Sequence, residues 1–155
     1  MELLWEELTR GLGSGRQLSQ LVIQLIAAAV LGGVVGTQRH HAGKPAGVRT
    51  HMLVCLGTAV VVVTCARMGI SLDGQSRVIQ GIVTGIGFVG AGSILKLSQE
   101  HEIRGLTSAA ALWMTAGIGV ACGGDQIGIA LIGAVLTVIV LTYAGVLERR
   151  AQKKD

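Results

Sequence analysis

The sequence predicts an all-α membrane protein with about five transmembrane helices, tight glycine-rich packing and an N-terminal interfacial helix. Half of the 155 residues are hydrophobic and only 14% are charged, against about 25% charged residues in soluble domains. Five uncharged segments of 17 to 22 residues separate the charged positions, and a membrane-spanning helix needs about 17 to 25 residues. The connections between these segments are too short for a second domain, which excludes a soluble enzyme with its own large core.

The first 16 residues have a pattern of their own. Leu4, Leu8 and Leu12 recur one helical turn apart, and glutamates occupy other positions on the helix. This pattern is typical of an amphipathic helix in the membrane interface, ended by the Gly-rich stretch 11–15. A helix that docks onto a partner protein would look the same. We expect an interfacial helix over 1–16, a five-span membrane domain over 17–147 and a basic cytoplasmic tail over 148–155.

The distribution of Lys and Arg predicts the orientation in the membrane. Basic residues are retained on the cytoplasmic side of short loops. Nine Lys and Arg lie in the 38–49 loop, the 96–104 loop and the C-terminal tail, and four lie at the opposite ends of the spans. We therefore expect the N-terminus outside and the C-terminus in the cytoplasm. The basic residues sit at segment ends without an aromatic-rich surface, so lipid head groups are the expected partner and nucleic acid is not.

Glycine carries the packing signal. The 24 glycines would destabilise soluble helices by about 1 kcal/mol each, but in lipid small residues let helices approach closely. The pairs spaced by four residues are Gly32 and Gly36, Gly81 and Gly85, Gly119 and Gly123, and Gly124 and Gly128. We expect the third and fourth spans to form a tight pair. The residues predicted to pack there are Gly81, Gly85, Gly87, Gly90 and Gly92.

Residues 85–90 also match the G-x-G-x-x-G pattern of dinucleotide-binding proteins. That pattern functions at a turn from a strand into a helix, whereas here it lies in the middle of a predicted span. Helix packing is therefore the favoured interpretation, with an ion-lining break in the helix as the other alternative. No cofactor is predicted.

The densest polar cluster lies in the loop and helix starts over 38–51. Its candidate site residues are Arg39, Lys44, Arg49 and His51. These cations and imidazoles could bind an anion, a lipid phosphate or an acidic partner surface. The simpler alternative is a basic anchor around a turn fixed by Pro45. A metal site at His40 and His41 is disfavoured because the loop is cationic.

Few other polar residues suggest chemistry. Asp73 and Arg77 stand four residues apart at the start of the third span, where an ion pair would stabilise the helix. Asp73 is also the one candidate ligand for a hydrated divalent cation. The hydroxyls of Thr107 and Ser108 are available to cap the fourth span. No charged residue lies within the spans and no nucleophile stands with a base, so neither an ion pump nor an enzyme is expected.

Several motifs in order resemble the MgtC/SapB family of bacterial inner-membrane proteins. They are Lys-Pro-Ala-Gly-Val-Arg-Thr-His at 44–51, Asp73 with Arg77, Gly-Ile-Gly-Phe-Val-Gly-Ala-Gly at 85–92, and Gly-Leu-Thr-Ser-Ala-Ala-Ala-Leu-Trp at 105–113. The resemblance implies a five-span domain in the inner membrane without recognised catalytic activity. It also implies a link to magnesium limitation and virulence, and for some members restraint of the F-type ATP synthase.

The chain departs from the family pattern in two places. Members commonly have Gly-x-Glu-Arg before the basic loop, whereas Gln38 stands here at the position of the glutamate. Many members also carry a soluble C-terminal domain, and this sequence resembles the short form without it. We expect a regulatory membrane subunit that acts through a second copy or another membrane protein, such as the ATP synthase or a magnesium transporter. The alternative is an oligomeric transporter or channel subunit for Mg²⁺ or a related ion.

Overall fold

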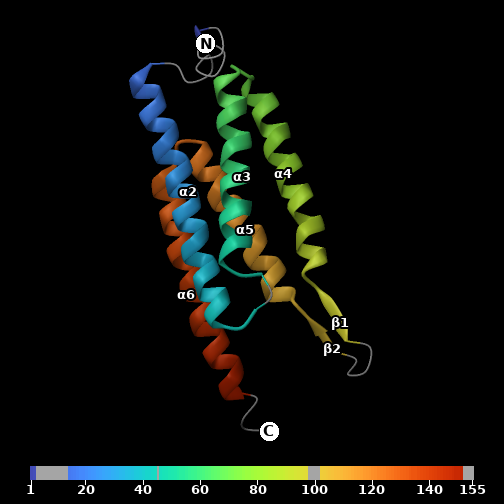
Figure 1. The fold of residues 1–155 in the computed structure, drawn as a ribbon. Coiled ribbons are helices and arrows are strands. Elements are labelled where there is room, and N and C mark those ends of the chain that lie inside the picture. Colours follow the sequence, from blue (N-terminus) through green and yellow to red (C-terminus); the bar gives the residue numbers. More distant parts are fainter. Residues whose placement is uncertain (3–13, 45, 98–101, 152–155) are drawn as a thin grey trace.

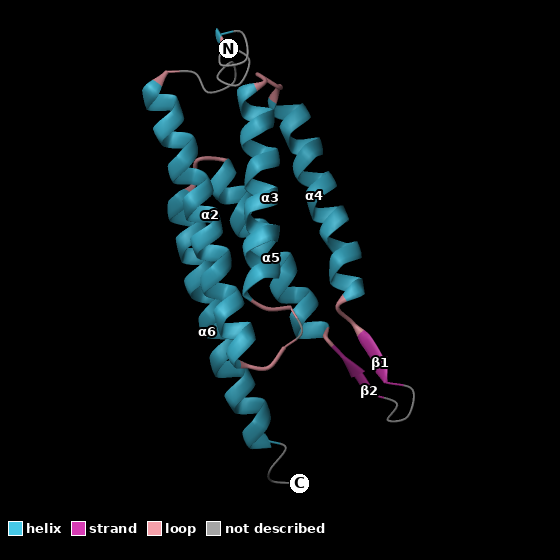
Figure 2. Ribbon diagram, viewed as in Figure 1, coloured by secondary structure: helices cyan, strands magenta, loops and turns pink. Residues whose placement is uncertain are grey.

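The computed structural model describes residues 1–2, 14–44, 46–97 and 102–151 and is a bundle of long helices (Figures 1 and 2). In chain order, the elements are α2 (Gly15–His41), α3 (Val48–Arg67), α4 (Leu72–Gly92), β1 (Leu95–Leu97), β2 (Glu102–Arg104), α5 (Leu106–Gly123) and α6 (Ile127–Ala151). Each helix contains most of one uncharged segment, so the prediction of an all-α membrane protein is confirmed. Most of the predicted interfacial helix over 1–16 lies outside the described residues.

Local sequence explains where the helices begin and end. Gly43 follows α2 and Gly69 follows α3, both with a positive φ that a glycine adopts without strain. The hydroxyl of Ser71 accepts a hydrogen bond from the backbone N–H of Gly74 and so caps α4. Helices α2, α3 and α5 are long and apolar enough to cross a membrane, and α6 contains a shorter apolar stretch, Ile127–Tyr143.

Two parts of the chain differ from the sequence-based expectation. The 96–104 segment, expected as a loop, contains the antiparallel strands β1 and β2, with Leu95 opposite Arg104. Helix α6 continues to Ala151, so the first residues of the predicted tail over 148–155 extend the last helix. The hairpin projects from the end of the bundle where α4 ends and α5 begins (Figure 2).

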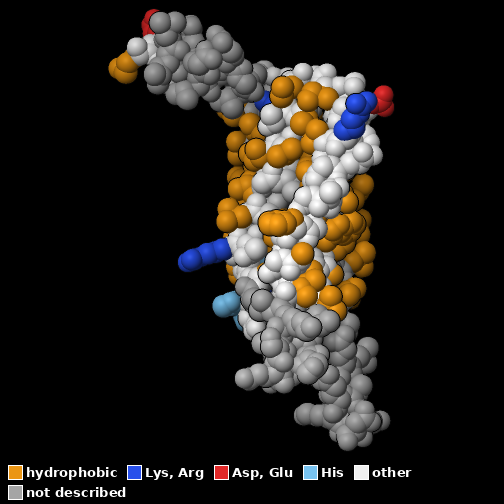
Figure 3. Space-filling view, turned by 90° about the vertical axis from the view of Figure 1, so that its right-hand side faces the viewer, with side chains coloured by type: hydrophobic (Ala, Val, Ile, Leu, Met, Phe, Trp, Pro, Cys, Tyr) orange, Lys and Arg blue, Asp and Glu red, His pale blue; other side chains and the backbone are white. Residues whose placement is uncertain are grey.

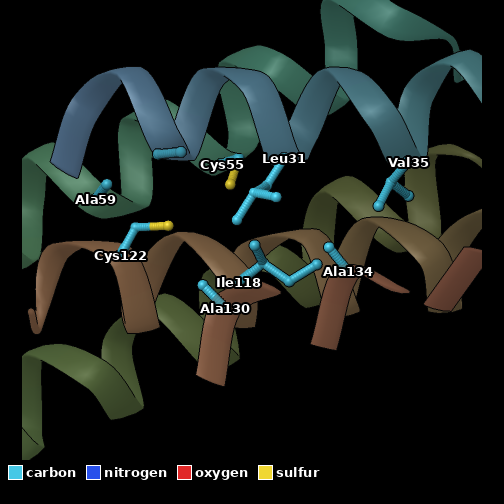
Figure 4. Close-up of a cluster of buried hydrophobic side chains, with 9 residues drawn as sticks. Leu31, Val35, Cys55, Ala59, Ile118, Cys122, Ala130 and Ala134 are labelled. Atoms are coloured by element: carbon cyan, nitrogen blue, oxygen red, sulfur yellow. The ribbon is translucent and has the colours of Figure 1, made fainter. Parts of the chain in front are cut away.

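The core is an apolar cluster between four of the helices (Figure 4). Its buried members are Ala28, Leu31, Val35, Cys55, Ala59, Ile118, Cys122, Ala130 and Ala134, from α2, α3, α5 and α6. Small residues predominate, which allows the helix backbones to lie close together. The cysteines Cys55 and Cys122 are free thiols and serve here as small core side chains, as expected from their positions in apolar spans.

Glycines bring α2, α3 and α5 into backbone contact. A Cβ built on Gly32 would lie 2.7 Å from the carbonyl oxygen of His51, and one built on Gly36 would lie 2.6 Å from the Cα of Val48. On α5, a Cβ at Gly123 would lie 2.6 Å from the carbonyl oxygen of Ala59. The predicted use of glycine for close packing is therefore confirmed for the α2–α3 and α3–α5 contacts.

Helix α4 packs much less closely than predicted. Only Ile86 and Gly90 of its residues are buried, and a Cβ on Gly90 would meet the Cβ of Ala109 in α5 at 3.4 Å. A Cβ on Gly81, Gly85, Gly87 or Gly92 would meet no heavy atom within 4 Å among the described residues. The tight pair expected between the third and fourth spans is thus limited to the end of α4 next to the hairpin. A packing role for the four open glycines stays a prediction that requires another chain.

Candidate functional site

The most unusual feature of the bundle is a buried cation at the end that holds the 42–47 loop, which we call the basic end. Arg39 lies in the last turn of α2 and is only 2% exposed. Its Nη2 donates a hydrogen bond of 2.9 Å to the Oγ of Ser108, which lies in the first turn of α5 and is 1% exposed. The contact joins two helices that are distant in the sequence, and both partners are shielded from solvent.

His51 lies at the same end of the bundle, in the first turn of α3. It is completely buried, and its Nδ1 lies 3.0 Å from the carbonyl oxygen of Gly47. Gly36 places His51 there, because a Cβ at Gly36 would lie only 3.1 Å from the Cβ of the histidine. The structure therefore buries two of the four predicted anion-binding residues, Arg39 and His51, at one end of the bundle.

Three buried polar atoms at the basic end have no hydrogen-bond partner among the described residues. They are Nε of Arg39, Nε2 of His51 and Oε1 of Gln38. Arg39 also makes no ion pair with a described carboxylate. Removing one charge from water costs several kcal/mol unless an opposite charge and hydrogen bonds compensate it. Oε1 of Gln38 is an acceptor, and so is Nε2 of a neutral His51 whose Nδ1 donates to the carbonyl of Gly47. The basic end thus retains one unused donor for an anion, Nε of Arg39.

The other two predicted residues of the cluster lie at the surface. Lys44 and Arg49 are exposed, and so are His40 and His41, whose ring centroids are 6.1 Å apart. The N-caps of α3 and α5 are Gly47 and Gly105, and neither helix start has a side-chain cap. Free N–H groups at helix starts carry partial positive charge. Both helix starts therefore add to the positive potential at the basic end.

Ser108 has a different role from the predicted one. The sequence suggested that it caps α5, but the N-cap is Gly105, and the hydroxyl of Ser108 accepts a hydrogen bond from Arg39 instead. The pattern Gly-Leu-Thr-Ser marks a helix start and contains no sign of a partner that lies 69 residues away in the sequence. Only the packing of α2 against α5 reveals this contact.

The remaining predicted site residues are separate from this cluster. Asp73 and Arg77 are exposed in the first turns of α4 and do not form an ion pair with each other. No group of three or more His, Cys, Asp or Glu side chains gathers anywhere among the described residues. The role of Asp73 as a metal ligand stays a prediction. Residues 85–90 lie within the unbroken helix α4 and follow no strand, so the geometry of a dinucleotide-binding turn is not present there.

A second set of polar residues, which the sequence did not single out, lies at the other end of the bundle. Gln20 and Gln24 are one turn apart in α2, and both amides donate to the carboxylate of Asp125, at 2.8 and 3.2 Å. In the sequence analysis, Asp125 only marked the boundary between the last two uncharged segments. Two glutamines one turn apart in an otherwise apolar span were the available signal.

Comparison with known proteins finds relatives over most of the chain. A model of the MgtC family matches residues 25–150. The Escherichia coli K12 protein named "Putative magnesium transporter YhiD" is 38% identical over 145 residues, which cover 88% of this chain and 66% of YhiD. Protein MgtC of Salmonella typhimurium LT2 is 41% identical over 133 residues, covering 86% of this chain and 54% of MgtC. Protein SrpB of Synechococcus elongatus is 39% identical over 144 residues, which cover 84% of this chain and 78% of SrpB.

The chain thus spans about two thirds of YhiD and about half of MgtC. No solved structure gives a significant match. The matched family region contains all five described helices except the first ten residues of α2 and the last residue of α6. Since the family model covers far more than half of the sequence, this multi-pass membrane protein belongs to the MgtC family.

Proposed function

We propose that this protein is a non-enzymatic regulatory subunit in magnesium homeostasis, which acts by binding another membrane protein or a second copy of itself. The link to magnesium follows the family and the name of its relative YhiD. The regulatory role rests on the exposed face of α4. In the cell, the resemblance suggests the F-type ATP synthase or a magnesium transporter as partners.

The exposed face of α4 suits a protein partner better than lipid. Gln80 and Thr84 are exposed, and their side chains make no hydrogen bond among the described residues. Around them lie the open glycines Gly81, Gly85 and Gly87. Unpaired polar groups are costly in hydrocarbon, and small residues with polar neighbours are typical of contacts between membrane helices. Figure 3 views the molecule from the side of α4 and shows backbone and polar atoms among the hydrophobic side chains.

The interior of the bundle supports regulation over transport. The apolar cluster of α2, α3, α5 and α6 lies between the basic end and the end that holds Asp125. Its small side chains pack the helices together, and an ion that leaves water needs polar ligands along its path. A single chain with this core is better suited to bind a partner than to conduct an ion.

We also propose an orientation in the inner membrane, with the N-terminus outside and the C-terminus in the cytoplasm. It rests on the nine Lys and Arg on one side of the spans against four on the other. In this orientation, the basic end with Lys44 and Arg49 faces the cytoplasm, where an acidic partner surface or lipid phosphates would meet it.

A leucine at Gly85 tests the binding face. Gly85→Leu should leave the fold intact, because no described atom lies within 4 Å of the new Cβ. It should abolish most of the cross-linked complex in native membranes, since the larger side chain separates helices that glycine lets touch. Gly57→Leu, at an open glycine of α3, is the matched control and should cross-link as the wild type does. Unchanged cross-linking of Gly85→Leu would contradict a binding role for this face.

The alternative, an oligomeric transporter subunit for Mg²⁺ or a related ion, is favoured by the name of YhiD and by the polar residues around Asp125. The purified protein in liposomes that contain a magnesium-sensitive dye separates the two functions. Regulation predicts no influx of Mg²⁺ above that of empty liposomes. Influx above this background would assign transport to the chain itself.

A further inference from the structure

A large cavity opens at the end of the bundle opposite to the basic end. Its volume is about 980 Å³, and its walls come from the start of α2, the end of α3, the start of α4 and the turn between α5 and α6. The polar side chains that matter for its chemistry are Gln20, Gln24, Gln75, Arg67 and Asp125. The rest of the wall is mostly apolar. The family assignment and the regulatory function proposed above do not use this cavity.

The backbone at Asp125 has a conformation that glycine would adopt more easily. Its φ is +62°, the one positive value among the described residues other than glycine. The N–H of Gln126 bonds to the carbonyl of Ala121 at 2.8 Å and that of Asp125 to the carbonyl of Cys122 at 3.3 Å, so Asp125 occupies the position after α5 where glycine is usual. A carboxylate is also unfavourable at the negative end of a helix dipole. The start of α6 at Ile127 lies on its other side and offsets that cost. The sequence thus places a carboxylate, rather than the usual glycine, where it lines the cavity.

The glutamines around the cavity use their amide nitrogens in hydrogen bonds within the protein. The amide nitrogens of Gln20 and Gln24 donate to Asp125, and Gln24 is held firmly because it is only 6% exposed. The amide nitrogen of Gln75 donates to the carbonyl of Ile70 at 2.9 Å. An amide whose nitrogen is engaged in this way has its oxygen left to accept from a ligand. Carboxylate and amide oxygens together form a lining rich in acceptors.

We propose that this cavity binds a hydrated divalent cation, with Asp125 as its charged contact and the oxygens of Gln20, Gln24 and Gln75 accepting hydrogen bonds from its waters. Magnesium suits such a site because it gives up its water reluctantly and is usually held through one or two carboxylates. Six waters occupy about 180 Å³ at about 30 Å³ each, which the cavity can hold. Arg67 also lines the cavity, where its guanidinium donates to the carbonyl of Gln17 at 2.6 Å and keeps its positive charge. This charge opposes that of the cation, so we expect weak binding.

The thermal stability of the purified full chain tests this site. Unfolding in uncharged detergent micelles is followed by circular dichroism as MgCl₂ is added, against NaCl at matched ionic strength. A ligand that binds only the folded state raises the midpoint of unfolding. We expect the midpoint to begin to rise near about 1 mM MgCl₂, the range of weak extracellular sites, and to increase with the logarithm of the concentration above it. Hexaamminecobalt(III), whose ligands do not exchange, should act like Mg²⁺ because the site contacts the ion through its shell.

Four variants locate the response. Asp125→Asn and Gln24→Leu should each need at least a tenfold higher MgCl₂ concentration for the same rise in the midpoint of unfolding. Asp125→Gly should also lose the response, and it keeps the test valid because glycine favours this backbone conformation. Asp73 is the other candidate metal ligand and does not line the cavity, so Asp73→Asn separates the two candidates. If the cavity is the site that stabilises the fold, this variant keeps the response to MgCl₂.

Several results would overturn the site. One is a midpoint that responds to MgCl₂ no more than to NaCl at matched ionic strength. Others are a response that survives Asp125→Gly, or one that Asp73→Asn abolishes. A response to ethylammonium chloride alone would identify a site for organic amines instead. Because the measurement needs no partner, its failure is distinguishable from a failure of the regulatory function.

Discussion

Replacing Gly119 with alanine is expected to be among the most destabilising single changes in this chain. The added Cβ would overlap the Oγ1 of Thr58 and the carbonyl oxygen of Cys55, both in α3. The threonine hydroxyl can rotate away, but the carbonyl belongs to the helix backbone. Helices α3 and α5 must therefore move apart, and with them the core around Cys55 and Cys122. Overpacking of this kind costs about 1 to 3 kcal/mol and occasionally more, and we expect the upper end, about 3 kcal/mol.

Gly117 provides the matched control on the same helix. A Cβ at Gly117 would meet no described atom within 4 Å, and alanine favours a helix by up to about 1 kcal/mol over glycine. Gly117→Ala should therefore leave the free energy of unfolding unchanged or raise it slightly. Reversible unfolding in mixed micelles, followed by circular dichroism, measures both variants. Equal stabilities of the two alanine variants would show that α3 and α5 are not in backbone contact at Gly119.

The fold could be predicted from the charges, but the choice of helix pairs could not. A charged side chain in the middle of a bilayer is energetically costly, so long segments without charge indicate membrane spans. The five uncharged segments correspond to the five helices. The glycine pairs at 32 and 36, 81 and 85, and 119 and 123 have the same spacing. Among the residues that the structure describes, only the first and last of these pairs contact a neighbouring helix. Spacing identifies a face that permits close approach, and it carries no information on which helix approaches it.

The sequence predicted which residues form the candidate site, but it did not predict which of them are buried. Arg39, Lys44, Arg49 and His51 were predicted as one cluster because they lie close together in the sequence. Of these four, only Arg39 and His51 are buried. Helical phase decides this, because Arg39 and His51 lie on helix faces turned toward the neighbouring helices, whereas Arg49 does not. The contacts of Asp125 with Gln20 and Gln24 span about a hundred residues in the sequence. No local pattern links groups at such a separation.

The second large effect is expected at the buried pair of Arg39 and Ser108. Ser108→Ala removes the hydroxyl that accepts from Arg39 and leaves a buried guanidinium with less compensation. Hydrogen bonds to charged groups contribute about 1.5 to 3 kcal/mol, so we expect a loss of about 2 kcal/mol in the free energy of unfolding. Thr107→Val, at the exposed neighbouring position, is the control and should be nearly neutral.

Arg39→Met should behave in the opposite way, because it removes the charge that needs compensation. Replacing buried charges with apolar side chains of similar size is often neutral or stabilising by about 1 to 4 kcal/mol. In the background of Arg39→Met, Ser108→Ala should lower the free energy of unfolding by almost nothing further. The two changes are then coupled by about 2 kcal/mol. Additive effects of the two changes would show that Ser108 stabilises the bundle independently of Arg39. A strongly destabilised Arg39→Met would show instead that the guanidinium is compensated in the folded protein, and the basic end would then have no spare capacity for an anion.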